Sequence, residues 1–189
     1  MFSIFKSYLL IATKEDKIGG FIMNLFLTGP VQVGKTTLLN SIIQTLNAKT
    51  YGYYTKPYSN NNSVIGYKMF DYTSTIEPFI IGIKDTPTTC QPIIENFETK
   101  GVSLLNAALE SNEVIILDEL GVLESKAYQF QEKVHECLDS RKLVLGVIKK
   151  KHSTFLNQIR KRKDMIIIEV TPENRDYLLD EIMNILNKK

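Results

Sequence analysis

One stretch of the sequence has the residue types and spacing that hold a polyphosphate. Residues 29–36 read Gly-Pro-Val-Gln-Val-Gly-Lys-Thr and fit the pattern G-x-x-x-x-G-K-[ST]. The glycines let a backbone fold closely around phosphates, and the amide groups of such a loop supply partial positive charge. The residues expected to bind the nucleotide phosphates are Gly29, Pro30, Val31, Gln32, Val33, Gly34, Lys35, Thr36 and Thr37.

A second segment supplies the acidic groups that such a loop needs. Residues 113–119 form an apolar run that ends in Asp118 and Glu119, as a Walker B strand does. Lys35 is expected to reach the β- and γ-phosphates, and the Thr36 hydroxyl and Asp118 to hold Mg²⁺. Glu119 is then free to polarise an attacking water. The alternative is that the two carboxylates only open a solvated loop.

A basic segment follows the next apolar run. Seven lysines and arginines and no acidic residue occur between Lys149 and Lys163. Most of them are expected to lie on a solvated surface. Arg160 and Arg162 are the candidates for neutralising charge on the transferring phosphoryl group, because a guanidinium matches phosphate oxygens. Nucleic-acid binding by this segment is disfavoured because few aromatic residues interleave it.

Apolar runs typical of strands alternate with amphipathic patterns typical of helices from residue 24 onward. Two strand-like runs separated by a turn-forming Ser-Asn-Asn-Asn-Ser segment predict a hairpin. The strands are expected at 24–28, 51–56, 64–71, 114–117, 143–148 and 165–170, with 78–83 as one more candidate, and the helices at 38–46, 104–109, 128–138 and 155–159. A final helix is expected with Thr171 as N-cap and Pro172 at its first position.

This alternation predicts an α/β fold of three layers. The sheet is expected to be mainly parallel, with helices on both faces and the hairpin added to it. A Walker B carboxylate followed by glutamate further predicts that the strand at 143–148 lies between the phosphate-loop strand and the Walker B strand. The end of that strand then points Lys149 and its neighbours toward the γ-phosphate.

Composition narrows the remaining choices. The 189 residues are 43% hydrophobic and carry a net charge of +2, which excludes overall disorder and argues against a nucleic-acid or membrane partner. Cys90 and Cys137 lie far apart and suggest neither a disulfide nor a zinc site, so a reducing cytoplasm is expected. We expect one domain over residues 23–189, preceded by a flexible or wrongly assigned leader at 1–22. Its apolar run is too short for a usual signal peptide.

The motifs together resemble the P-loop nucleoside-triphosphatase family that includes cancer-related nucleoside-triphosphatase. The resemblance rests most on the segment from Leu117 to Glu124 and on Thr171-Pro172-Glu173-Asn174-Arg175. It implies a RecA-like fold and Mg²⁺-dependent hydrolysis of ATP, GTP and other nucleoside triphosphates to the diphosphate and phosphate. Many members have a G-x-x-V-G-x-Y-x-V stretch that residues 72–101 do not reproduce, which leaves the base preference open.

Two other functions remain open at this point. One is a nucleotide or small-molecule kinase, which must exclude water until its acceptor binds. The other is a nucleotide-gated binding module, for example for RNA. Tyr53, Tyr54 or Phe155 could stack on a base, although core packing is the commoner role of such residues.

Overall fold

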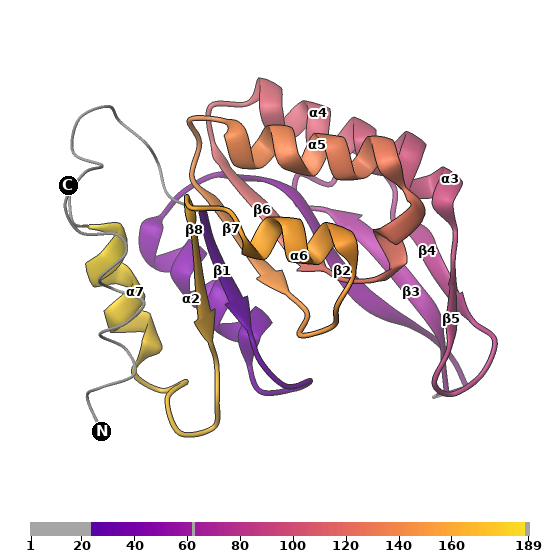
Figure 1. The fold of residues 1–189 in the computed structure, drawn as a ribbon, viewed down its shortest axis with the longest axis horizontal. Coiled ribbons are helices and arrows are strands. Elements are labelled where there is room, and N and C mark those ends of the chain that lie inside the picture. Colours follow the sequence, from indigo (N-terminus) through magenta and orange to yellow (C-terminus); the bar gives the residue numbers. More distant parts are fainter. Residues whose placement is uncertain (1–23, 62, 188–189) are drawn as a thin grey trace.

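The computed structural model describes residues 24–61 and 63–187, so the expected leader at 1–22 lies outside the described residues. An eight-stranded mixed sheet runs through the molecule in the order β5-β4-β3-β2-β6-β7-β1-β8 (Figure 1). The strands are β1 (Asn24–Thr28), β2 (Thr50–Asn60), β3 (Ser63–Asp71), β4 (Phe79–Lys84), β5 (Cys90–Pro92), β6 (Val114–Leu120), β7 (Val144–Ile148) and β8 (Met165–Glu169).

The five strands from β2 to β8 in this order pair in parallel, and β3, β4 and β5 extend the sheet in antiparallel fashion. The predicted hairpin is therefore confirmed as β2 and β3, and β4 confirms the candidate strand at 78–83. The strand at 143–148 is confirmed as β7, between β6 and β1. Every residue of β7 is buried, because layers cover both faces of a parallel sheet.

Helices cover the two faces of the sheet and confirm the three-layer arrangement (Figure 1). One face carries α4 (Val102–Glu110), α5 (Tyr128–Asp139) and α6 (Thr154–Arg160), and the other carries α2 (Lys35–Leu46) and α7 (Leu178–Leu186). The alternation of β1 shows why there are two cores. Phe26 belongs to one apolar cluster, whereas Leu25 and Leu27 belong to the other. None of the described helices is long and apolar enough to cross a membrane.

The segment that carries no sequence motif folds against the first of these cores. After β5 it forms α3 (Ile94–Asn96) and a wide helical turn, η1 (Phe97–Gly101), which leads directly into α4. Phe97 is buried there, with its ring centroid 5.1 Å from that of Phe130 on α5. A short turn, η2 (Leu123–Lys126), connects β6 to α5. These turns depend on distant packing partners, which local periodicity does not reveal.

The prediction of a final helix starting at Thr171 is wrong, because α7 begins only at Leu178. The Asn174 side chain accepts a hydrogen bond from the Thr171 amide and donates one to the Glu169 carbonyl, both at 2.8 Å. Residues 172–177 consequently fold as successive turns rather than as helix. The apolar face assigned to the helix is correct for Leu178 and Ile182, which are both buried.

A buried aspartate organises the loop that follows the hairpin. The carboxylate of Asp71 accepts hydrogen bonds of 2.6–2.9 Å from the amides and hydroxyls of Thr73 and Thr75. Burial alone would raise its pKa, but these hydrogen bonds hold the pKa of Asp71 below its ordinary value. Asp71 thus fixes the start of the loop between β3 and β4.

We predict that Asp71→Asn lowers the free energy of unfolding by about 1–3 kcal/mol, because the amide nitrogen replaces an acceptor that several partly buried donors share. Urea denaturation measures this change. Asp85→Asn is the matched control, since Asp85 also accepts hydrogen bonds from neighbouring threonines but is exposed. Equal stability losses in the two variants would contradict the role assigned to Asp71.

Candidate active site

The phosphate-loop pattern lies between the end of β1 and the start of α2. Gly29 has φ +140° and Gly34 has φ +107°, a region that favours glycine. A Cβ on Gly29 would lie 2.3 Å from the Val170 carbonyl oxygen, so the loop can pass there only without a side chain. The ammonium of Lys35 donates to the carbonyls of Gly29 at 3.0 Å and Pro30 at 2.6 Å. The loop therefore encloses its own lysine at the N-terminus of a twelve-residue helix.

Asp118 and Thr36 meet beside this loop. Asp118 lies in β6 with Tyr54 and Val147 as its neighbours on β2 and β7. The Thr36 hydroxyl, on the residue after Lys35, favours the charged form of Asp118 and so lowers its pKa against the effect of burial. Asp118 is only 4% exposed, and burial raises its pKa to about 6. Since β6 continues to Leu120, the alternative that Asp118 and Glu119 merely open a solvated loop is wrong.

This pair suits a hard divalent cation. A carboxylate and a hydroxyl offer the oxygen ligands that Mg²⁺ takes, and Mg²⁺ usually needs only one or two protein ligands beside water and phosphate. Within residues 24–61 and 63–187, no group of three or more His, Cys, Asp and Glu side chains could hold a metal by itself. The residues therefore fit Mg²⁺ shared with a phosphate better than a closed all-protein site.

Glu119 faces a lysine rather than solvent. Its carboxylate lies 2.5 Å from the Lys149 ammonium, and both side chains are partly buried. The register between β6 and β7 shifts between Asp118 and Leu120, so Glu119 lies in an irregularity of the ladder. Burial disfavours the charge of Lys149, yet Glu119 holds the pKa of that lysine above its ordinary value. Lys149 is thus the charged partner that fixes the orientation of Glu119.

Arg160 and Arg162, which were expected at the phosphates, bond to other groups in the structure, so this expectation needs correction. Arg162 forms ion pairs with Asp139 at 2.7 Å and with Asp164 at 2.5 Å. The Asp164 carbonyl bonds the amide of Asn24, which places Arg162 where β1 begins, at the opposite end from the phosphate loop. The Arg160 guanidinium donates to the carbonyls of Lys149 and Lys151. Arg160 therefore supports the backbone after β7, and its guanidinium is not free for a phosphate.

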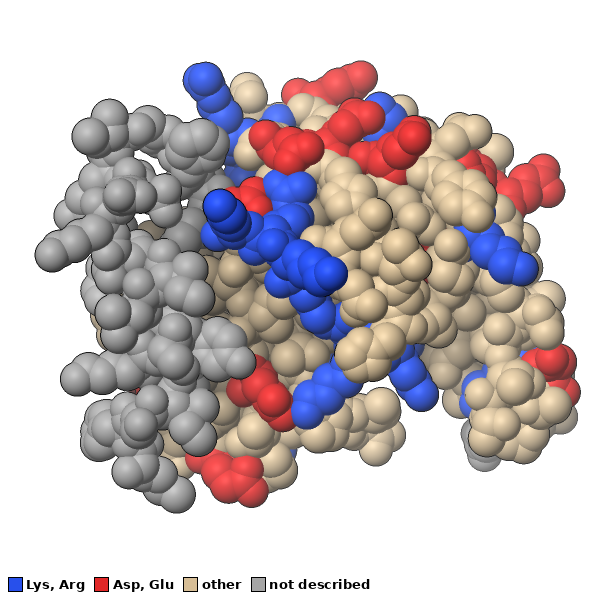
Figure 2. Space-filling model, in the orientation of Figure 1, with Lys and Arg blue, Asp and Glu red and all other residues tan. Residues whose placement is uncertain are grey.

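The rest of the basic segment is largely surface. Figure 2 shows lysine and arginine side chains gathered in a band on the face that α6 covers, with acidic side chains close to them. Lys150, for example, pairs with Glu169 at 2.5 Å, and both side chains are about half exposed. The expectation that most of these charges are solvated therefore agrees with the structure. Lys149 is the member of the segment that reaches the carboxylates.

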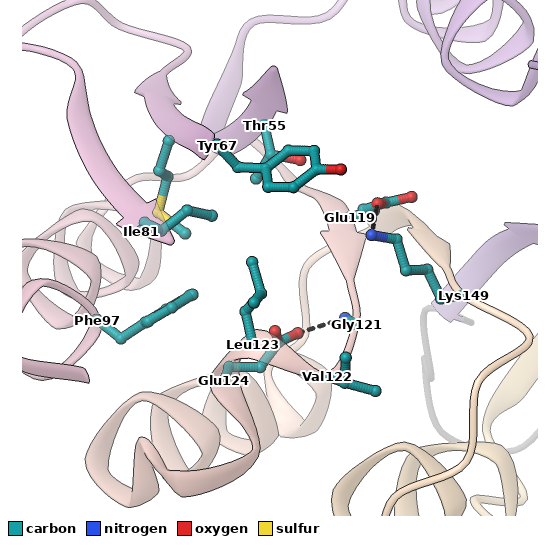
Figure 3. A pocket seen from close by; sticks show the side chains of 11 residues that line it. Thr55, Tyr67, Ile81, Phe97, Glu119, Gly121, Val122, Leu123, Glu124 and Lys149 are labelled. Carbon is teal, nitrogen blue, oxygen red and sulfur yellow. Dashed lines mark hydrogen bonds and ion pairs between the residues drawn. The ribbon is translucent and has the colours of Figure 1, made fainter. Parts of the chain in front are cut away.

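A small cavity adjoins Glu119 (Figure 3). Its volume of about 20 Å³ is enough for one water molecule, and its wall includes Tyr67, Glu119, Glu124 and Lys149. Glu124 is only 3% exposed and accepts a 2.5 Å hydrogen bond from the Gly121 amide. The sequence motif includes Glu124 but predicts no role for it. Arg160 and Arg162 were preferred over Lys149 as the residues that neutralise charge on the phosphoryl group. The signal that could have found Lys149 is its place directly after a buried strand.

The three aromatic residues considered for stacking on a base differ in how far their side chains are buried. Tyr53 is 1% and Phe155 2% exposed, and both belong to the core on the α4 and α5 face. Tyr54 is partly exposed and points to the other face of the sheet. Of the three residues considered for stacking, only Tyr54 is thus accessible.

Comparison with known proteins gives one consistent result. The sequence pattern that defines the NTPase family matches residues 24–183. Nucleoside-triphosphatase THEP1 of Thermotoga maritima is 32% identical over 169 residues, which cover 87% of this chain and 95% of that protein. The human cancer-related nucleoside-triphosphatase is 31% identical over 179 residues, covering 85% of this chain and 94% of that protein.

Solved structures agree with the sequence matches. The crystal structure of THEP1 from Aquifex aeolicus superposes with a TM-score of 0.71 at 25% identity, covering 88% of this chain and all of that chain. The solution structure of the human cancer-related nucleoside triphosphatase gives a TM-score of 0.69 at 26% identity, covering 88% of this chain and 98% of that chain. The fold and nearly the whole length of these proteins are thus shared with this chain.

Burial gives Glu124 a testable signature in the pH dependence of stability. Burial raises the pKa of its carboxyl to about 7, above the ordinary value of 4.5. Between these two pH values the unfolded chain is ionised while the folded chain keeps the proton, so stability falls as pH rises. We predict that Glu124→Gln removes up to roughly 3 kcal/mol of this loss between pH 4.5 and pH 7.

Urea denaturation of wild type and Glu124→Gln at several pH values measures the difference. The exposed Glu110 supplies the control, because Glu110→Gln should keep the wild-type pH dependence. Parallel stability curves for wild type and Glu124→Gln would show that this carboxyl titrates normally.

Proposed function

Because this chain belongs to the NTPase family and is a nucleoside-triphosphatase, we propose that it hydrolyses the γ-phosphate of ATP, GTP and other nucleoside triphosphates with Mg²⁺. The products are the diphosphate and phosphate. The observation that carries this proposal is the meeting of the phosphate loop, the Thr36 and Asp118 pair and Glu119 at one end of three neighbouring strands. The phosphate loop would bind the phosphates, Thr36 and Asp118 would hold the metal ion, and Glu119 would activate the attacking water.

The phosphate loop accounts for binding. Its backbone amides and the N-terminus of α2 attract the phosphate oxygens, and Lys35 exchanges its two loop carbonyls for oxygens of the β- and γ-phosphates. Thr36 and Asp118 would hold Mg²⁺, which when bound supplies positive charge to the β- and γ-phosphates. All of these contacts are made to the phosphates, so the site would bind nucleoside triphosphates with different bases equally well.

Glu119 accounts for the attack of water. Its carboxylate borders the cavity, and it can accept a proton from a water held there while orienting that water toward the γ-phosphate. Lys149 holds the carboxylate in a fixed direction through their ion pair.

We predict that Glu119→Gln binds nucleotide normally but hydrolyses it about 10²- to 10⁴-fold more slowly, because the amide cannot accept the proton. Lys35→Ala should instead weaken nucleotide binding. Phosphate release with Mg²⁺ or with EDTA and binding of a fluorescent nucleotide separate the two effects. Undiminished phosphate release from Glu119→Gln would refute the role of this carboxylate.

We further predict that Lys149→Ala lowers kcat about tenfold to a hundredfold with little change in KM, because Glu119 loses its fixed direction. Lys149→Arg should restore most of the rate, since it keeps a cation beside Glu119. Lys150→Ala is the matched control, because Lys150 pairs with the exposed Glu169 instead. A rise in KM alone would mean that Lys149 binds substrate and does not position the glutamate.

A further inference from the structure

One face of the hairpin is rich in aromatic rings and lysines. The register pairs Tyr54 with Phe70 and Lys56 with Lys68 on β2 and β3. Alternate residues of a strand point to the same face. The set that shares this face, called here the hairpin face, consists of Tyr54, Lys56, Tyr58, Lys68, Phe70 and Tyr72.

Apart from Tyr72, which packs against the apolar cluster of α2 and α7, the hairpin face is not covered by a helix of the described chain. The helices on that side of the sheet are α2 and α7, which pack with β1, β7 and β8 and with each other (Figure 1). The opposite face of the same strands is closed by α4 and α5, where Tyr53 and Met69 are buried. The aromatic members of the hairpin face are only partly buried.

The rings of this face form a platform. Those of Tyr54 and Phe70 are stacked, with centroids 5.1 Å apart and planes 8° apart, and Tyr72 meets Tyr54 edge-on at 5.1 Å. The ammonium of the exposed Lys56 lies 4.9 Å from the centre of the Tyr54 ring, and that of Lys68 lies 4.4 Å from the Tyr58 ring. Since Lys56 lies over the Tyr54 ring, a group that stacks there must displace its ammonium, which an exposed and flexible side chain allows.

A hollow borders the platform at its Tyr54 end. It has a volume of about 120 Å³, and its wall includes Tyr54, Phe70, Ser74 and Glu77. Ser74 can donate and accept hydrogen bonds, and Glu77 can accept them. A planar group that stacks on Tyr54 would therefore find polar partners for its edge.

We propose that the hairpin face binds single-stranded nucleic acid, with bases stacked on its rings and phosphates close to Lys56 and Lys68. Single strands are bound in this way without sequence preference, by aromatic platforms flanked by cations. Alternate residues of a strand are about 7 Å apart, so rings and lysines recur along β2 and β3 as bases and phosphates do along a strand. Over Thr50–Tyr54 of β2 and Gly66–Met69 of β3 the backbone already pairs on both sides, so this part of the hairpin offers no free edge to a peptide strand.

The position of the hairpin face would bring bound nucleic acid close to the candidate active site. Tyr54 is the neighbour of Asp118 across β2 and β6, so a bound strand would lie beside the candidate metal ligand. The net charge of +2 and the scarcity of aromatic residues in the basic segment at 149–163 both predict no nucleic-acid partner, but neither describes a local surface. The hairpin face is a separate surface, formed only when β2 and β3 pair.

Fluorescence anisotropy of a labelled twelve-nucleotide oligouridine with a 5′-hydroxyl tests the proposal, in EDTA and without nucleotide. We expect binding that Tyr54→Leu and Phe70→Leu each weaken about tenfold or more. Tyr128→Leu is the matched control, since Tyr128 is 69% exposed but lies on α5 beyond the other face of the sheet. Thermal unfolding midpoints close to that of wild type show that the variants are folded.

Salt dependence provides the second measurement. Two lysines predict a slope of log affinity against log salt of about −1.4, and Lys56→Gln or Lys68→Gln should make it shallower by about 0.7. Lys161→Gln, in the basic segment, should leave the slope unchanged. Because Lys56 and Lys161 are exposed and Lys68 is partly exposed, these lysine variants keep the test valid even where a ring variant fails to fold.

Three results with the oligouridine itself would overturn the proposal, and a fourth comes from competition. They are absence of oligouridine binding, equal weakening by Tyr128→Leu, and a slope steeper than about −4, which would point to the basic segment. Competition by uridine monophosphate at the same concentration as the oligomer would also overturn it and indicate a small-molecule site. Lys35→Ala should abolish hydrolysis but not oligouridine binding, so failure of the proposed hydrolysis is distinguishable from failure of this inference.

Discussion

The insertion of β7 between β1 and β6 is the constraint on which the rest of the site depends. Its fit is tight, because a Cβ on Gly146 would lie 2.5 Å from the Phe26 ring and 2.7 Å from the Leu117 carbonyl oxygen. Three parallel strands therefore end side by side at one edge of the sheet. That edge receives the phosphate loop from β1, the two carboxylates from β6 and Lys149 from β7. Apolar packing at the centre of the sheet thus fixes the distances between charged groups at its edge.

The charges at this edge are arranged as coupled pairs. Lys35 and Lys149 lie with Asp118 and Glu119 in one electrostatic group, and each influences the pKa of others. Burial opposes ionisation of Asp118, whereas Glu119 and Lys149 stabilise each other directly. A polyphosphate with a divalent cation would bring further charges of both signs. The site is therefore suited to a ligand that satisfies Lys35 and Asp118 together.

Local patterns were enough to predict the phosphate loop and most of the elements, and analogy with other Walker B sequences predicted the place of β7 between β1 and β6. The loop is recognisable because glycines, lysine and threonine act there through nearby backbone, and the strands because burial on both faces demands unbroken apolar runs. The roles of Arg160 and Arg162 were not predictable, because they depend on Asp139 and on carbonyls that only folding brings near. The prediction of where α7 begins was wrong for the same reason, because Asn174 donates a hydrogen bond to a carbonyl outside the helix.

The hairpin was visible in the sequence, but its two surfaces were not. Alternate residues whose side chains point to the covered face of the hairpin, among them Thr55 and Tyr67, line the cavity beside Glu119. The residues between them, among them Tyr54 and Phe70, point to the other face and form the open platform. Because both sets share the same two backbones, a shift of β2 or β3 moves both surfaces at once. An occupant of the open face would in this way act on the strands that line the cavity beside Glu119.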